Sequence, residues 1–215
     1  MPIFNGIEFI DESVKSVLSQ TMTEWELIIG INGHESNSKI YQLAKSYETV
    51  SNKIHVYDLY EMRGKPNSLN EMMKYVKYSH VAILDVDDVW NAHKLEKQMP
   101  YVIEKQYDVV GSRCIYFGNT HMNGIVPWIP TGDISGFDFF HVNPIINSSS
   151  IIKKEYAKWD NSFVEDYDLW LSLRKQNKRF FNCNEILVKH RIHDQSAFNS
   201  KGNSNHVSEL LEKHK

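Results

Sequence analysis

Segments typical of buried strands alternate with segments typical of amphipathic helices through the first half of this 215-residue chain. The strand-like segments are 26–31, 54–59 and 81–84, and the helix-like segments are 9–18, 40–47 and 69–76. The first group is rich in Ile, Leu and Val, whereas the second repeats apolar residues at intervals of three and four. Connections between neighbouring parallel strands are right-handed crossovers through a helix. The alternation therefore predicts an α/β fold with a doubly wound, mostly parallel central sheet flanked by helices.

The second half of the chain is less regular, but it contains further strand and helix candidates. Strands are predicted at 108–112, 145–152 and 186–192, and a helix is predicted at 165–176. A stretch rich in Gly, Asn and Pro at 118–136 indicates a surface loop. The sequence contains no internal repeat and no obvious linker, so we expect a single domain over residues 1–215.

Charge and cysteine usage exclude several classes of protein. The formal charge of −3, with Lys and Arg scattered along the chain, provides no basic excess to neutralise nucleic-acid phosphates. Two cysteines, Cys114 and Cys183, favour neither a disulfide scaffold nor a cysteine-type zinc site, and they indicate a reducing compartment. No apolar stretch approaches the roughly 20 residues that span a bilayer. We therefore expect no nucleic-acid partner, no transmembrane segment and a soluble, cytoplasmic protein that could still be peripheral to a membrane.

Three aspartates directly follow the apolar run 81–84. Asp85, Asp87 and Asp88 stand at the carboxyl end of a predicted strand, which is where open α/β sheets bind their ligands. Like charges this close repel one another unless a cation neutralises them, and oxygen ligands favour Mg²⁺ or Mn²⁺. One aspartate could instead cap the following helix, but Asn91 can serve as that cap. The cluster therefore predicts a divalent-cation site that could hold the diphosphate of a nucleotide.

Six segments of the chain carry distinctive combinations of residues. They are P-I-F-N-G at 2–6, S-V-L-S-Q-T at 16–21, R-G-K with L-N at 63–70, D-V-D-D-V-W at 85–90, E-D-Y-D-L-W at 165–170 and H-R-I-H at 190–193. In this order and at these spacings they resemble the motifs of the family 2 glycosyltransferases, a large nucleotide-sugar-dependent group with the GT-A fold. The D-V-D triplet resembles that family's DxD motif. Each motif alone is weak, but the series covers the chain from residue 2 to about residue 196.

The resemblance implies a reaction and a division of the domain into two halves. Residues 1–110, approximately, would bind the nucleotide sugar, and residues from about 111 to 215 would bind the acceptor. The enzyme would move a hexose from a nucleotide-diphosphate sugar, with a UDP-sugar as the first expectation, to a hydroxyl of a carbohydrate or glycoconjugate acceptor. The transfer would depend on Mn²⁺ or Mg²⁺ and would invert the anomeric carbon.

The same resemblance implies roles for four residues in donor binding. Phe4 would lie against the uracil face, although an aromatic residue here could equally belong to the core. Asn32 stands where the family usually has the second of two aspartates, and its amide can still contact the base. Ile31 replaces the first of those aspartates, which departs from the family pattern. Lys65 would lie near the nucleotide or be an ordinary surface lysine, and Asp85 would contact the ribose or a metal-bound water.

The metal ligands implied by the resemblance come from both halves of the chain. Asp87 would bind the cation directly, and His193 would complete the metal shell from the end of a predicted strand. A lone histidine is more often a surface or core residue, so its place within the H-R-I-H motif is what singles out His193. His190 and Asp88 are expected to be structural.

Asp166 is the residue that the resemblance implies as general base, taking the proton of the acceptor hydroxyl. Its place at the start of a predicted helix would favour the ionised carboxylate, because the helix dipole is positive there. Glu165 and Asp166 would also be ordinary first-turn residues in any helix. Asp168 is the alternative base.

Two other functions fit parts of the sequence. A noncatalytic nucleotide- or carbohydrate-binding module on the same fold would account for the replacement at Ile31. A sugar nucleotidyltransferase is disfavoured, because residues 1–15 contain only Gly6 and lack the Gly-rich phosphate loop that such enzymes share.

Both ends of the sequence leave open whether it is complete. The family's first strand runs through several apolar residues before its Pro, but only Met1 precedes Pro2. We expect either a short first strand or a sequence that begins late. Residues 208–215 resemble a surface helix and could equally be a cut point, so the chain could be the N-terminal part of a longer polypeptide.

Overall fold

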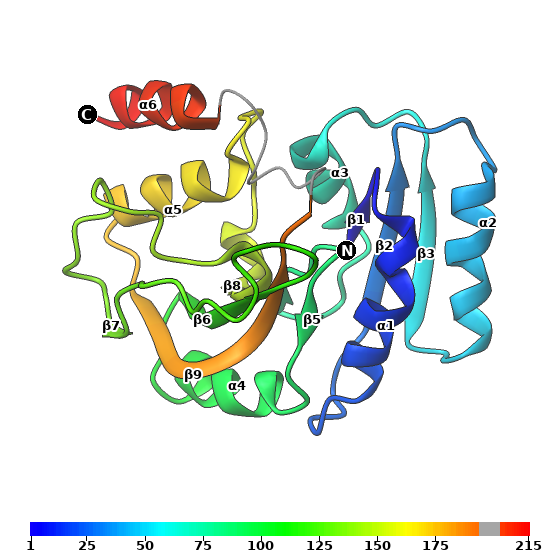
Figure 1. The fold of residues 1–215 in the computed structure, drawn as a ribbon, viewed down its shortest axis with the longest axis horizontal. Helices are drawn as coiled ribbons and strands as arrows, with labels where there is room; N and C mark the ends of the chain where they lie inside the picture. The colour runs from blue at the N-terminus through cyan, green and yellow to red at the C-terminus, as the bar shows by residue number, and fades with distance from the viewer. Residues whose placement is uncertain (194–202) are drawn as a thin grey trace.

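The computed structural model describes residues 1–193 and 203–215, which form a mixed α/β fold with two sheets side by side (Figure 1). The first sheet is parallel, in the order β1–β2–β3, with the bounds β1 Pro2–Ile3, β2 Leu27–Asn32 and β3 Ile54–Leu59. All six residues of β2 are buried, in agreement with the buried strand predicted at 26–31.

Helices cover both faces of the first sheet, as a doubly wound arrangement requires. They are α1 Ile10–Leu18, α2 Lys39–Lys45 and α3 Lys65–Met72, with single 3₁₀ turns at η1 Ile7–Phe9 and η2 Ser46–Thr49. Successive residues of a strand point to opposite faces, so Ile29 packs in one cluster with Val14 of α1 and Ala44 of α2. Its neighbour Ile28 packs instead with Met72 of α3.

The second sheet is built around the long parallel pair of β6 and β9. Its order is β4–β8–β6–β9–β5 with β7 beside β9, and the bounds are β4 His80–Ala82, β5 Val89–Trp90, β6 Val109–Phe117, β7 Gly132–Asp133, β8 Ile151–Lys153 and β9 Phe180–Arg191. Parallel pairings hold most of the paired residues of the fold, as predicted. The shorter strands of this sheet pair antiparallel. The alternation of strands and helices does not predict these antiparallel pairs, because no helical crossover leads into β8 to set its direction.

Three longer helices and two 3₁₀ turns complete the described structure. They are α4 Lys94–Ile103, α5 Glu165–Lys175 and α6 Asn203–His214, with η3 Asn147–Ser149 and η4 Lys154–Tyr156. Helix α6 packs on α5, where Lys213 Nζ and His214 Nε2 lie 2.8 and 2.6 Å from the buried carboxylate of Asp168. Among the helices of residues 1–193 and 203–215, none has the length and apolar character needed to cross a membrane.

Several predicted boundaries were wrong in the second half. The strand predicted at 145–152 is reduced to β8, because 147–149 form a 3₁₀ turn. The strand predicted at 186–192 begins six residues earlier, at Phe180, and ends at Arg191, since β9 also contains the polar residues Asn182, Asn184 and Glu185. The predicted strand boundaries were based on runs of apolar residues, and polar residues inside these segments interrupt such runs.

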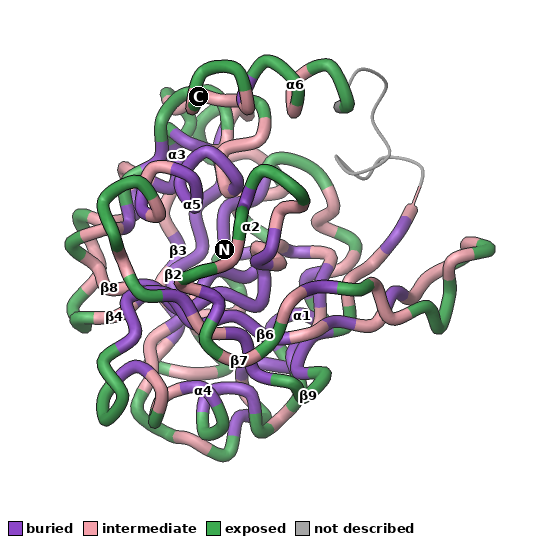
Figure 2. The backbone as a smooth tube through the Cα atoms, turned by 90° about the vertical axis from the view of Figure 1, so that its left-hand side faces the viewer, coloured by how far each residue is buried: buried purple, intermediate pink, exposed green. Residues whose placement is uncertain are grey.

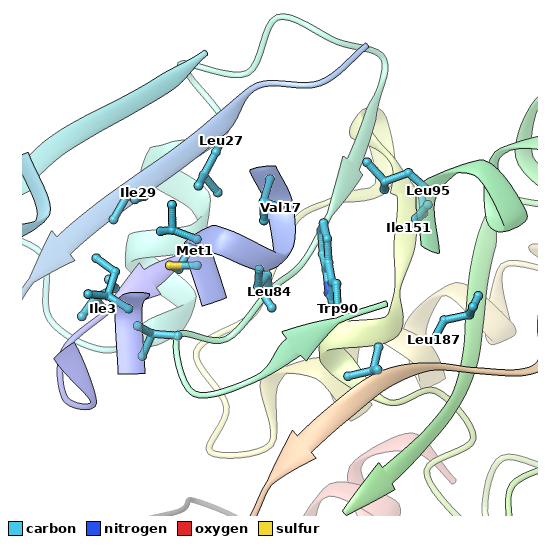
Figure 3. Close-up of a cluster of buried hydrophobic side chains, with 14 of the residues drawn as sticks. Met1, Ile3, Val17, Leu27, Ile29, Leu84, Trp90, Leu95, Ile151 and Leu187 are labelled. Atoms are coloured by element: carbon cyan, nitrogen blue, oxygen red, sulfur yellow. The ribbon is translucent and has the colours of Figure 1, made fainter. Parts of the chain in front are cut away.

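Buried residues follow the strands, whereas the outer helix α6 is largely exposed (Figure 2). The principal core cluster contains residues from both sheets, among them Ile29, Leu84 and Ile151 (Figure 3). Two further clusters lie against α3 and α5. The apolar core therefore continues from one sheet to the other, and it fixes the position of the strand ends at which the polar residues gather.

Candidate active site

One cavity of about 620 Å³ is lined by the carboxyl ends of β1 and β2 and by the turn after β4. Parallel strands deliver their carboxyl ends to the same edge of a sheet, which explains why segments far apart in sequence meet here. All the donor and metal residues expected from sequence line this cavity: Phe4, Asn32, Lys65, Asp85, Asp87 and His193. The expected general base, Asp166, is not among the lining residues; its neighbour in sequence, Glu165, is ion-paired with the lining residue Lys65.

Phe4 presents an open aromatic face at this cavity. Its side chain is 52% exposed, which excludes the core interpretation, and its ring stacks on that of His34 with centroids 5.3 Å apart. Gly33 makes room for the ring, because a Cβ there would lie 2.7 Å from Phe4 and the backbone φ of +76° disfavours other residues. Asn32, which ends β2, is almost completely buried beside it.

Lys65 forms ion pairs with two carboxylates, while 34% of its side chain is exposed. Its Nζ lies 2.8 Å from Oδ1 of Asp85 and 3.0 Å from Oε1 of Glu165. Burial opposes the charge, but these two carboxylates outweigh it and raise the pKa of Lys65 well above its usual range. Lys65 is therefore an ion-paired lysine in the lining of the cavity.

Asp85 is fixed in the ionised state by a network from three segments. The amide of Asn147 donates to its Oδ2 at 3.0 Å, and its backbone N–H donates to Oγ of Ser148 at 3.1 Å. Burial would raise the pKa of Asp85, but Lys65 and Asn147 lower it overall. Asp85 is therefore a preorganised hydrogen-bond acceptor for a hydroxyl or a water in the cavity.

Asp87 and His193 are neighbours in the lining of the cavity. Nε2 of His193 lies 3.1 Å from Oδ2 of Asp87. Burial, together with the charges of Asp88 and Asp85, raises the pKa of Asp87. Added positive charge near Asp87 would therefore stabilise its ionised carboxylate.

Asp88 has a structural role, as expected, and does not line the cavity. It is fully buried and accepts hydrogen bonds from the backbone N–H of Arg191 at 2.8 Å and from Nδ1 of His190 at 3.0 Å. Burial opposes protonation of His190, but Asp88 raises its pKa to about 9. Of the three clustered aspartates, only Asp85 and Asp87 are therefore placed to contact a ligand in the cavity.

The donor atoms around Asp87 suit a divalent cation that also binds a ligand. Among residues 1–193 and 203–215, no group of three His, Cys, Asp or Glu side chains is arranged so that it could hold a metal ion. Mg²⁺ sites that act on phosphates use one or two protein carboxylates and leave positions for the substrate, and imidazole is also a suitable ligand for transition metals. The pair of Asp87 and His193 fits such an open site.

Asp166 lies in the first turn of α5 and is held by Asn143, whose amide donates to its Oδ2 at 3.2 Å. Burial, followed by the charge of Glu165, raises the pKa of Asp166 to about 6. Asp168 is a different case, because Lys213 and His214 lower its pKa against the effect of burial. The alternative assignment of Asp168 as base is therefore disfavoured, since its carboxylate is occupied by α6.

Two residues that support the site were missed by the sequence analysis. Asn143 follows a loop and matches no motif, so only its contact with Asp166 reveals it. Arg191 lies within the H-R-I-H motif, which could have indicated it. Its Nε donates to the backbone O of Asp87 at 2.9 Å, and its guanidinium stacks 4.4 Å from the Phe9 ring. It therefore ties the turn that contains Asp87 to the end of β9.

Solved structures of glycosyltransferases share this architecture. Residues 1–349 of S. aureus TarS, in complex with UDP-GlcNAc, match 99% of this chain and 63% of that chain, with a TM-score of 0.76 and 14% sequence identity. The mannosyltransferase PcManGT from Pyrobaculum calidifontis, in complex with GDP-Man and Mn²⁺, matches 99% of this chain and 61% of that chain, with a TM-score of 0.71 and 13% identity. This chain thus spans just under two thirds of either chain. The fold is the GT-A fold of glycosyltransferases.

Sequence comparison identifies the family. The chain belongs to glycosyl transferase family 2, whose family model matches residues 1–159. The O-antigen biosynthesis glycosyltransferase WbnJ of Escherichia coli is 32% identical over 213 residues, covering 92% of this chain and 80% of that protein. The UDP-Glc:alpha-D-GlcNAc-diphosphoundecaprenol beta-1,3-glucosyltransferase WfgD of Escherichia coli is 27% identical over 206 residues, covering 94% and 79%. The protein is therefore a glycosyltransferase, as the motifs predicted.

Proposed function

We propose that the enzyme moves a hexose from a UDP-sugar to a hydroxyl of a carbohydrate or glycoconjugate acceptor, with Mn²⁺ or Mg²⁺ held by Asp87 and His193. The observation that carries the proposal is the convergence on one cavity of about 620 Å³ of the exposed ring of Phe4, the adjacent side chains of Asp87 and His193, and the ionised Asp85. That volume lies within the range of small-ligand sites. The name of the relative WfgD, which includes UDP-Glc, supports the UDP-sugar, as does the complex of the structurally similar TarS with UDP-GlcNAc.

The nucleoside would bind at the edge formed by β1 and β2. The open face of Phe4 offers a stacking surface for the uracil, and the amide of Asn32 can both donate to and accept from the base. Asp85, fixed by Lys65 and Asn147, would accept a hydrogen bond from a ribose hydroxyl. Each of these residues would act in binding rather than in bond cleavage.

The diphosphate would lie toward Asp87 and His193. A bound divalent cation supplies positive charge that stabilises the diphosphate as it leaves. Asp87 is the group best prepared to hold the cation, since burial and its acidic neighbours penalise its charge when no cation is bound. Arg191 keeps the backbone of Asp87 in place while the ligand changes the charge of the site.

Asp166 would act as the general base. It would take the proton of the acceptor hydroxyl while that oxygen forms a bond to the anomeric carbon and the bond from this carbon to the diphosphate breaks. Attack from the opposite side gives inversion. With its pKa raised to about 6, Asp166 is ionised at neutral pH and is a stronger base than an ordinary carboxylate.

A noncatalytic binding module remains the second candidate, because the buried Ile31 replaces an aspartate of the family pattern. Release of UDP from UDP-Glc and UDP-GlcNAc separates the two candidates when it is measured with Mn²⁺ over a panel of saccharide acceptors. We expect the native chain to release UDP. In Asp166→Asn we expect the rate of UDP release to fall about 10²-fold or more, while the affinity for the donor is kept. The matched control is Glu104→Gln, an exposed carboxylate directly after α4, for which turnover should be unchanged. Donor binding without turnover in the native chain would favour the binding module.

A further inference from the structure

Lys65 lies between the residues that would bind the donor and the helix that carries Asp166. It lines the cavity of about 620 Å³ from the start of α3, whereas its two ion-pair partners come from the turn after β4 and from the start of α5. Its Nζ lies 2.8 Å from Oδ1 of Asp85 and 3.0 Å from Oε1 of Glu165. Glu165 directly precedes Asp166 in the first turn of α5. One ammonium group therefore connects the cavity to the helix of the general base.

The stability of α3 does not explain the place of this lysine. Lys65 is the first residue of the helix, where the helix dipole is positive and disfavours a cation. Burial opposes its charge as well, but Asp85 and Glu165 outweigh burial and raise the pKa of Lys65 well above its usual range. The ammonium is therefore kept at this point by the carboxylates that it faces.

Helix α3 and the start of α5 are held together without the ion pair. Nδ2 of Asn70, on α3, donates to the carbonyl of Trp159 at 2.7 Å, and Oδ1 of Asn70 accepts from the N–H of Trp159 at 3.0 Å. Trp159 belongs to the segment that leads into α5. Leu69 of α3 also packs in one apolar cluster with Tyr167 of α5. Removing one charge of the ion pair should therefore change the electrostatics of the site more than its geometry.

Charges of both signs act on Asp166 from the elements packed around it. Burial raises the pKa of Asp166 most and the charge of Glu165 raises it further, whereas Lys65 of α3 lowers it. Asn143, in the segment before β8, contributes a hydrogen bond and no charge. The charged groups that α6 brings to α5 pair with Asp168 instead. Lys65 is therefore the cation that favours the ionised form of Asp166.

We propose that Lys65 serves the donor site and the general base at once, as a counter-ion shared by Asp85 and the first turn of α5, and that Glu165 is the positioning residue that holds it there. Lys65 fixes Asp85 as an acceptor and also stabilises the charged Asp166 that receives the proton of the acceptor hydroxyl. Glu165 opposes this second effect through its own charge. The inference rests on the proposed function for the roles of Asp85 and Asp166, but the ionisation of Asp166 is measurable without turnover.

Carbon-13 NMR of the full chain, labelled at the aspartate carboxyl carbons, measures the ionisation of Asp166, and Asp166→Asn identifies its signal. In Glu165→Gln we expect the midpoint of this titration to fall by about 1 in pH, because a neighbouring like charge is lost. In Lys65→Met we expect the midpoint to rise by about 1 in pH, because an opposite charge is lost. Lys65→Arg keeps the charge and should stay close to the native midpoint.

Glu71→Gln is the matched control for these variants. It removes an ion pair with Lys74, 2.7 Å long, on the same helix α3, and it should leave the titration of Asp166 unchanged. An unchanged midpoint in Glu165→Gln, or shifts of the same sign in Glu165→Gln and Lys65→Met, would overturn the proposal. Because glutamine has the size of glutamate, Glu165→Gln tests the proposal even where Lys65→Met does not fold.

The two partners of Lys65 should differ in their effect on the donor. In isothermal titration with UDP and Mn²⁺, we expect Lys65→Met to weaken binding about tenfold or more, because Asp85 loses the cation that fixes it. Glu165→Gln should keep the native affinity, since Lys65 remains with Asp85. An equal loss of affinity in both variants would overturn the assignment of Glu165 as a positioning residue on the side of the base.

The pH dependence of UDP release separates this inference from the proposed function. If Asp166 is the base, the rise of the rate with pH moves to lower pH in Glu165→Gln, together with the NMR midpoint. A rate profile that stays in place while the NMR midpoint moves would reject Asp166 as the base and still support the link through Lys65. An NMR midpoint that stays in place would overturn the link.

Discussion

Nε2 of His193 lies 3.1 Å from Oδ2 of Asp87, although 106 positions separate the two residues in the sequence. Asp87 stands in the turn after β4, in the first half of the chain, and His193 follows β9 in the second. The cavity of about 620 Å³ is therefore complete only when both halves of the chain have folded against each other. Under the proposed function, Mn²⁺-dependent binding of the donor would report on the whole domain rather than on its first half alone.

Replacing His193 should weaken the use of metal without disturbing the nucleoside. In His193→Ala we expect the Mn²⁺ concentration for half-maximal UDP release to rise about tenfold or more, because one ligand of an open site is lost. His141→Ala is the control, since that side chain is exposed on a loop. A metal requirement unchanged in His193→Ala would show that His193 is not a ligand.

The pH dependence of transfer should follow Asp166. Because the raised pKa of this carboxyl is about 6, the rate should increase as pH rises through 6 and level off above it. Asn143 donates to the ionised form, so Asn143→Leu should move this limb to higher pH and leave the KM for the donor unchanged. A limb that stays at the same pH in Asn143→Leu would argue against Asp166 as the titrating base.

The same carboxyl should cost stability at neutral pH. Its pKa is higher in the folded state than the value of about 3.9 in an unfolded chain, so the folded state binds more protons between these values. The contribution of Asp166 to stability is therefore fully present below the unfolded pKa and is lost as pH rises through about 6. Asp166→Asn should be more stable than the native chain at pH 7.5, by about 2 kcal/mol, and no more stable at pH 3.5. Thermal unfolding at the two pH values measures this difference, and a loss of stability at pH 7.5 would refute it.

Phe4 should contribute to affinity and not to stability. Its ring is half-exposed, so Phe4→Ala should leave the Tm within about a degree while weakening UDP binding by about 1–3 kcal/mol, the range for base stacking on an aromatic ring. Phe4→Trp should keep the affinity. Phe163→Ala, which removes a still more exposed ring, is the control. A large drop in Tm for Phe4→Ala would place Phe4 in the core instead.

The parts of the fold predicted from sequence are those governed by local pattern. The continuous apolar run of β2 and the periodic apolar face of α1 each determine one element, and the strand end before Asp85 determines where polar residues collect. The direction of β8 depends on a long irregular connection, and no local pattern reports it.

The candidate site divides in the same way. Phe4, Lys65 and Asp87 lie in segments with recognisable motifs, so their places at one cavity could be expected. Asn143 could not, because its role depends on a contact across 23 positions with Asp166. The exclusion of Asp168 likewise depends on α6, whose Lys213 and His214 lie some 45 residues farther along the chain.

Isothermal titration of the protein with UDP, in Mn²⁺ and in excess chelator, tests the central claim most directly. We expect saturable binding with Mn²⁺ that is at least about tenfold weaker with chelator, a difference of about 1.4 kcal/mol, and we expect this difference to disappear in Asp87→Asn. Equal affinity for UDP with and without Mn²⁺, or no binding under either condition, would contradict a metal-dependent UDP-sugar site at Asp85, Asp87 and His193.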